Sequence, residues 1–366
     1  MRMKNFFAKP LGVVLAGGLI GLVAVLLQKS GNPANMGLCV ACFGRDVSGS
    51  LGLHRAEVVQ YLRPEFMALV LGAFLAAALT GEFKPRTGSS PALRFFLGFV
   101  VAVGALIFLG CPWRAFLRLA GGDLNALVGI IGLVAGIAAG SLFIKGRFSL
   151  GASRPAGALQ GLVLPLFMAG LLVLRLVYPQ VEGEPKSGLL FYSVSGPGSQ
   201  HAAVWASLAG GLIVGLLGQR SRFCSVGAVR DFILFRQNLL LLGVLGFIAF
   251  SFLGNLALGQ FHPGFSGQPI AHTNSVWNFL GLLIVGLGST LAGGCPGRQL
   301  FLAGEGDGDA AVFVMGLLAG LAMAHNFGLA SSGAGLGPMG AVGGIVCLVV
   351  VLAVGFLGKE KGAAAA

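Results

Sequence analysis

Ten apolar runs, each about 20 residues long, constrain this chain more than any other feature. A helix that crosses a bilayer needs about 20 mainly apolar residues. The first run follows Arg2, Lys4 and Lys9 as in a signal peptide, but it is long for one and no small-residue cleavage site clearly follows, so we expect a retained helix. We predict spans at 10–28, 64–80, 92–110, 124–144, 156–178, 200–218, 236–258, 275–294, 310–330 and 338–357.

The composition excludes a soluble protein of this length. Hydrophobic residues make up 56% of the 366 residues and charged residues only 10%, whereas soluble domains carry about 25% charged residues. The net charge of +12 comes from short Lys and Arg clusters between the apolar runs, which is typical of membrane topology rather than of nucleic-acid binding. We therefore expect an all-α membrane protein with about nine to ten transmembrane helices.

The distribution of positive charge predicts the orientation. Cytoplasmic loops of membrane proteins carry an excess of Lys and Arg. If the N-terminus lies inside, the inner segments hold more than twice as many of these residues as the outer segments. We therefore predict an even number of crossings with both termini in the cytoplasm.

Two cysteine motifs occur twice in the chain, at almost the same offset. One is a cysteine followed by Arg-Asp after five intervening residues, and the other is Gly-Cys-Pro-x-Arg with a Gly-Asp pair further on. Two independent motifs in register indicate an internal duplication. The motif cysteines and arginines are Cys39 with Arg45, Cys111 with Arg114, Cys224 with Arg230, and Cys295 with Arg298.

The duplication predicts two halves inserted in opposite directions, because five spans separate equivalent points. We assign residues 1–180 to the first repeat, 181–199 to an outer linker, 200–358 to the second repeat and 359–366 to a disordered tail. Inverted repeats with a site near the bilayer midplane are a recurring transporter design. Each motif cysteine adjoins a Gly- or Pro-interrupted segment, so short or re-entrant helices are expected where the two sets of cysteines approach from opposite sides.

Three chemistries are open to these cysteines. A metal site needs grouped ligands, and only Cys39 and Cys42 are closely spaced, so we expect no metal and no cofactor. Thiol redox exchange commonly uses Cys-x-x-Cys, but the position that matches Cys42 is Gly227. Transport of a soft, sulfur-like anion is the third option, because neutral thiols are weak donors and polarisable acceptors. The role of Cys42 stays open between packing and an outer-mouth thiol.

The four repeated arginines have two interpretations. In the first, they attract anions to the two ends of the path. In the second, they pair with repeated acids and stabilise their loops. Those acids are Asp46, Asp123, Asp231 and Asp307.

Other polar and aromatic residues give weaker signals. His325 and Asn326 fall inside the ninth span, where polar residues are costly. They either line the path or form a hydrogen bond between helices. Cys347 lies among aliphatic residues and is expected to be a small packing residue. We expect Trp113, Trp205 and Trp277 in interfacial belts and the loop histidines His54, His201, His262 and His272 at the interfaces.

The cysteine motifs resemble those of the YeeE/YedE family of bacterial membrane proteins. The segments GNPANMGLCVACFGRD, GLHRAEVVQYLRPE and FLGCPWRAFLRLAGGD are similar to the YedE branch, regarded as selenium transporters, whereas the YeeE branch takes up thiosulfate. The resemblance implies an hourglass of inverted halves in the bacterial inner membrane. It also implies a central cysteine relay for the anion and a small sulfur-carrier partner of the SirA/TusA type.

We therefore predict a transporter and not an enzyme. Its cargo is a small selenium- or sulfur-containing compound, with selenium favoured and a thiosulfate-like anion next. The path residues are the four motif cysteines and four arginines, with Cys42 and His325 as further candidates. The alternative is a membrane thiol–disulfide or sulfur-transfer enzyme that uses the same cysteines, and a purely structural subunit would leave all four dispensable.

Overall fold

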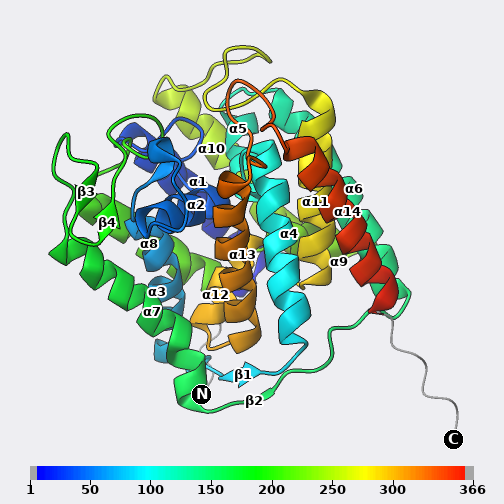
Figure 1. Ribbon diagram of the computed structural model, residues 1–366. Coiled ribbons are helices and arrows are strands. Elements are labelled where there is room, and N and C mark those ends of the chain that lie inside the picture. The colour runs from blue at the N-terminus through cyan, green and yellow to red at the C-terminus, as the bar shows by residue number, and fades with distance from the viewer. Residues whose placement is uncertain (1–5, 359–366) are drawn as a thin grey trace, which may run out of the picture.

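The structure, a computed structural model, describes residues 6–358, so the tail expected at 359–366 lies outside the described residues. The regular secondary structure of this part of the chain is helical apart from four two-residue strands (Figure 1). Each of the ten predicted spans coincides with a long helix. These helices are α1 (Pro10–Lys29), α3 (Pro64–Leu79), α4 (Pro91–Phe108), α6 (Asn125–Lys145), α7 (Ala158–Val177), α8 (Val204–Ser221), α10 (Leu239–Ala257), α11 (Ser275–Leu291), α13 (Gly308–Asn326) and α14 (Gly340–Leu357).

Nine stretches within residues 6–358 are long and apolar enough to cross a membrane. Helix α8 is not among them, because Gln219 and Arg220 in its last turn lower its mean hydropathy. The candidate spans thus agree with the expected nine to ten, and they indicate a multi-pass membrane protein. Helices α7 and α14 lie on opposite flanks of the bundle in Figure 1 and are the least enclosed of the nine.

Four short helices follow the four motif cysteines, each of which is the residue that caps its helix. Helix α4 ends at Phe108 and α11 at Leu291, and Pro112 and Pro296 open the next helices. Proline suits the first position of a helix because the first turn leaves its backbone N–H groups unpaired in any case. The expectation that the helices break at the cysteines is confirmed. The short helices are α2 (Val40–Ser50), α5 (Pro112–Ala120), α9 (Ser225–Phe235) and α12 (Pro296–Gly304).

Helices of the first half pack against helices of the second half. Helix α6 lies along α11, α4 along α13, α1 along α10 and α3 along α8. A Cβ atom added to Gly132 of α6 would lie 2.1 Å from the carbonyl oxygen of Phe279 in α11, and one added to Gly316 of α13 would lie 2.1 Å from that of Phe95 in α4. Such glycines let helix backbones approach closely. Gly132 and Gly316 are equivalent positions of the predicted duplication, and both make the same kind of contact.

Short elements connect the helices at both ends of the bundle. Strand β1 (Arg86–Thr87) pairs antiparallel with β2 (Arg154–Pro155), and β3 (Lys186–Ser187) pairs antiparallel with β4 (Leu190–Phe191). The β3–β4 hairpin lies within the segment predicted to be the outer linker. Two 3₁₀ helices complete the described chain, η1 (Phe6–Ala8) and η2 (Glu57–Val59).

The interfacial positions expected for Trp113, His54 and His272 are wrong. Trp113 is 1% exposed and packs in the core, where its ring centroid lies 5.8 Å from those of Phe223 and Phe301. His54 and His272 are also buried. The reason is that the loops and short helices fold back into the bundle, which hydropathy along the chain does not reveal.

Candidate functional site: two groups of buried cysteines

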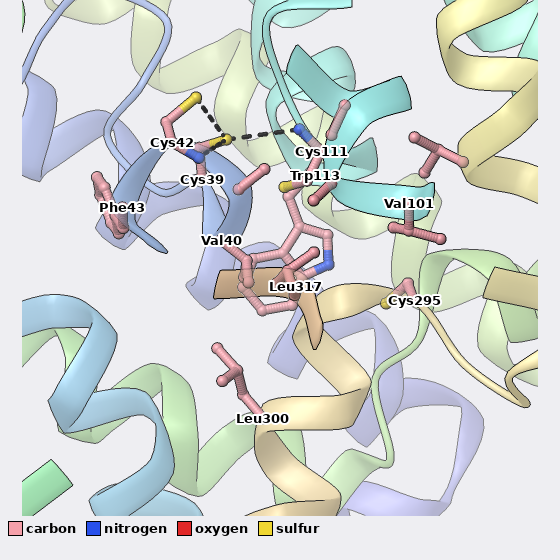
Figure 2. Close-up of a cluster of buried hydrophobic side chains, with 14 of the residues drawn as sticks. Cys39, Val40, Cys42, Phe43, Val101, Cys111, Trp113, Cys295, Leu300 and Leu317 are labelled. Atoms are coloured by element: carbon pink, nitrogen blue, oxygen red, sulfur yellow. Dashed lines mark hydrogen bonds between the residues drawn. The ribbon is translucent and has the colours of Figure 1, made fainter. Parts of the chain in front are cut away.

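The first group consists of Cys39, Cys42 and Cys111, which are free and buried. The Sγ atom of Cys39 lies 2.9 Å from Sγ of Cys42. It also accepts hydrogen bonds from the backbone N–H groups of Cys42 at 3.3 Å and Cys111 at 3.5 Å (Figure 2). Two motifs that are far apart in the sequence thus meet at one sulfur atom.

The second group consists of Cys224 and Cys295 and repeats the same contacts. The backbone N–H of Cys295 lies 3.5 Å from Sγ of Cys224, and that of Gly227 lies 3.1 Å from the same sulfur. Gly227 stands where Cys42 stands in the first group, so this group has one thiol fewer. Among residues 6–358 no cluster of three or more His, Cys, Asp or Glu side chains is arranged to hold a metal ion.

Arg114 brings an unneutralised positive charge to the first group. Its side chain is fully buried, and its guanidinium donates to the carbonyl oxygens of Asn35, Leu109 and Ile270. It also lies 3.6 Å from Sγ of Cys42. No carboxylate in the described chain lies within ion-pair distance of Arg114. Pairing with an acid is therefore the wrong interpretation for this arginine.

The other three motif arginines do pair with acids. Arg45 bonds Asp46 at 2.8 Å, and Arg230 bonds Asp231 at the same distance. Arg298 pairs at 3.0 Å with Glu305 rather than with the repeated Asp307. The remaining repeated acids have partners outside the motifs, since Asp123 binds Arg118 and Asp307 binds Arg86.

A cavity of about 360 Å³ is lined by residues that directly follow Ile270, the residue whose carbonyl oxygen Arg114 contacts. Its rim comes from exposed parts of 266–274 and 333–336, and its floor includes the buried residues Ala271 and His272. Nε2 of His272 donates to the carbonyl oxygen of Ile107 near the end of α4 at 2.8 Å. Burial lowers the pKa of His272, so the ring is neutral and its Nδ1 is an acceptor, which has no partner among the described residues.

Ile270 precedes the lining residues Ala271 and His272 and contacts Arg114. Its backbone has a φ of +49°, a left-handed conformation that is unfavourable for a β-branched residue. In this conformation its carbonyl oxygen accepts a hydrogen bond of 3.1 Å from Arg114. The segment 270–272 thus connects the lining of the cavity to Arg114.

His325 packs against His54. Its ring stacks on that of His54 with centroids 4.7 Å apart, and Nε2 of His54 lies 3.0 Å from the carbonyl oxygen of Arg45. Neighbouring Asn326 donates to the carbonyl oxygen of Leu53. These contacts join α13 to the end of α2, as expected for a pair of residues that holds helices together.

The second half of the chain shows a family likeness. Residues 220–355 match a family profile described as "Sulphur transport". That range holds the second cysteine group with Arg230 and Arg298. The chain is also 37% identical over 108 residues to the "Thiosulfate transporter TsuA" of Spirochaeta thermophila. This similarity covers 28% of the chain and 31% of the relative, so the chain matches about a third of the relative's length.

Proposed function

We propose that this protein carries a small sulfur-containing anion such as thiosulfate across a bacterial inner membrane. The observation that carries the proposal is Arg114, a buried cation that lies beside three thiols and has no carboxylate partner in the described chain. The likeness to a sulphur-transport family and to a thiosulfate transporter supports the same cargo.

The chemistry of the first group suits transient binding of an anion. A buried charge is unfavourable unless it is compensated. The carbonyl dipoles around Arg114 compensate its positive charge only in part, and an arriving anion would compensate the rest. Neutral thiols offer weak S–H donors and polarisable sulfur acceptors. Conduction needs binding that is strong enough for entry and weak enough for release, which neutral thiols satisfy better than a fixed ion pair.

The proposed path runs through both groups in two inverted halves. The cavity beside Ile270 is its outer entrance, and Cys39 and Cys111 come next. Cys224 and Cys295 follow, with Arg230 and Arg298 at the inner mouth, where a sulfur-carrier protein would receive the cargo. The matched sulfur contacts of the two groups and the excess of positive charge on the predicted inner loops support this arrangement, with both termini in the cytoplasm.

Uptake of radiolabelled thiosulfate by cells that depend on this protein tests the proposal. We expect Cys111→Ala to abolish uptake and Cys347→Ala to retain it, because Cys347 is buried in α14 away from both groups. Selenium oxyanions serve as competitors, since polarisable selenium suits the same thiols. Strong selenium-dependent accumulation with poor thiosulfate uptake would assign the cargo to selenium, and uptake that survives Cys111→Ala would contradict the path.

A thiol–disulfide or sulfur-transfer enzyme is the second candidate, favoured by the 2.9 Å contact between the sulfurs of Cys39 and Cys42. Serine preserves a hydroxyl donor, so a permeation path keeps part of its activity in Cys39→Ser and Cys42→Ser. Covalent sulfur chemistry falls to background in the same variants, because the hydroxyl does not replace the thiolate nucleophile. The size of the loss therefore separates the two functions.

A further inference from the structure

Trp113 occupies the space between the two cysteine groups. It lies two residues after Cys111 in the first turn of α5 and is 1% exposed. Figure 2 shows its indole ring between the group of Cys39 and Cys111 and the more distant Cys295. Its aromatic neighbours Phe223 and Phe301 come from the second half of the chain. A solute that passes from one group to the other meets this ring.

The fit of the ring depends on a glycine at the matching position. Gly297 holds the place in the second Gly-Cys-Pro-x-Arg motif that Trp113 holds in the first. A Cβ atom added to Gly297 would lie only 2.2 Å from Cζ2 of the indole. The two repeated motifs therefore meet face to face with one side chain between them, so the midpoint of the path contains a single tryptophan rather than a symmetric pair.

The indole N–H of Trp113 is buried and has no hydrogen-bond partner among the described residues. An indole nitrogen is a donor only. A buried donor without a partner is destabilising by about 1–3 kcal/mol, and such a group in a packed core calls for an explanation. An anion that passes the ring would accept this hydrogen bond.

We propose that Trp113 closes the path between the two cysteine groups and that its indole N–H binds the transported anion as it crosses. This inference rests on the proposed function. In the resting protein the ring fills the space between the two cysteine groups. The anion passes when the ring rotates out of the path. The unpaired donor then becomes a stabilising contact at the narrowest point, where water is excluded.

Substitutions at Trp113 separate the donor from the barrier. Trp113→Phe keeps most of the ring but removes the N–H, so we expect thiosulfate uptake to fall roughly tenfold, as for the loss of a hydrogen bond to a charged group. Trp113→Ala removes the ring from the path, so we expect this variant to admit sulfate and the wild type to exclude it. Trp205→Phe is the matched control, because Trp205 is 76% exposed and should leave uptake unchanged.

Tryptophan fluorescence of the purified protein supplies a readout that does not depend on transport. The titration is made in a Trp277→Phe background, because Trp277 lies beside the proposed entrance. In that background we expect thiosulfate to change the emission of the parent and of Trp205→Phe, but not that of Trp113→Phe. If the wild type takes up no thiosulfate, the proposed function fails, and the titration still decides whether Trp113 binds the anion. Wild-type uptake by Trp113→Phe, or an emission change that survives this substitution, would overturn the inference.

Discussion

A guanidinium buried without a carboxylate must be held by other acceptors, and Arg114 is held by three carbonyl oxygens and a thiol. Lysine keeps the charge but as a compact point on a flexible chain, so it does not reproduce this fork of donors. We expect Arg114→Lys to lower thiosulfate uptake roughly tenfold or more, because it loses hydrogen bonds made by a charged group. The control is Arg86→Lys, in a partly exposed pair with Asp307, where uptake should change less than about twofold.

A second residue-scale prediction concerns acid stability. Nδ1 of His54 accepts from the backbone N–H of Ala56 at 3.2 Å, so a neutral ring with its hydrogen on Nε2 fits both of its contacts. Burial lowers the pKa of His54 below its ordinary 6.5. The stability that this histidine contributes is therefore complete above about pH 6.5 and is lost as the pH falls through its native pKa.

The measurement is the Tm of the purified protein between about pH 7 and pH 5. We expect the Tm of the wild type to fall over this range and to fall less steeply in His54→Gln, which has no titratable ring. Equal slopes for the two proteins would show that His54 does not take part.

At the scale of elements, the long helices were predictable and the partners of the short ones were not. Each span is recognisable in the sequence as a run of about 20 apolar residues. Pro112 and Pro296 indicate where the helices break at the cysteines. The repeated motifs predict Asp123 only as a partner of a repeated arginine such as Arg114, which lies one turn from Arg118 on α5. In the folded chain Asp123 pairs with Arg118, and Arg114 contacts the thiol of Cys42 instead.

The contact between α4 and α13 gives a prediction about an element. A Cβ atom on Gly316 would lie 2.1 Å from the carbonyl oxygen of Phe95, so Gly316→Ala must separate the two helix backbones. Overpacking of this kind is destabilising by about 1–3 kcal/mol, and we expect a lower Tm. Gly170 of α7 has open space around its added Cβ, so Gly170→Ala should leave the Tm unchanged or raise it slightly. Similar Tm values for both variants would contradict this packing.

For the whole molecule, the predicted duplication gives two halves that are not equivalent. Gly227 replaces Cys42 and Gly297 replaces Trp113, so the first half supplies an extra thiol and the central ring. The aligned motifs contained both differences. Their meaning could not be predicted, because only the folded chain shows Trp113 packed against Gly297. If the chain is duplicated as proposed, these differences give the proposed path two distinct ends.

The outer end of that path is tested at Thr273, an exposed residue on the rim of the cavity. The six native cysteines are buried, so a membrane-impermeant, anionic maleimide should react in intact cells with the cysteine of Thr273→Cys. We expect the bulky, negatively charged adduct to block thiosulfate uptake, because it fills the entrance and repels the anion. Leu189→Cys, on the exposed β3–β4 connection, should be labelled from the same side and keep its uptake. Labelling of Thr273→Cys only after permeabilisation would reverse the predicted orientation, whereas full uptake after complete labelling would show that the anion enters elsewhere.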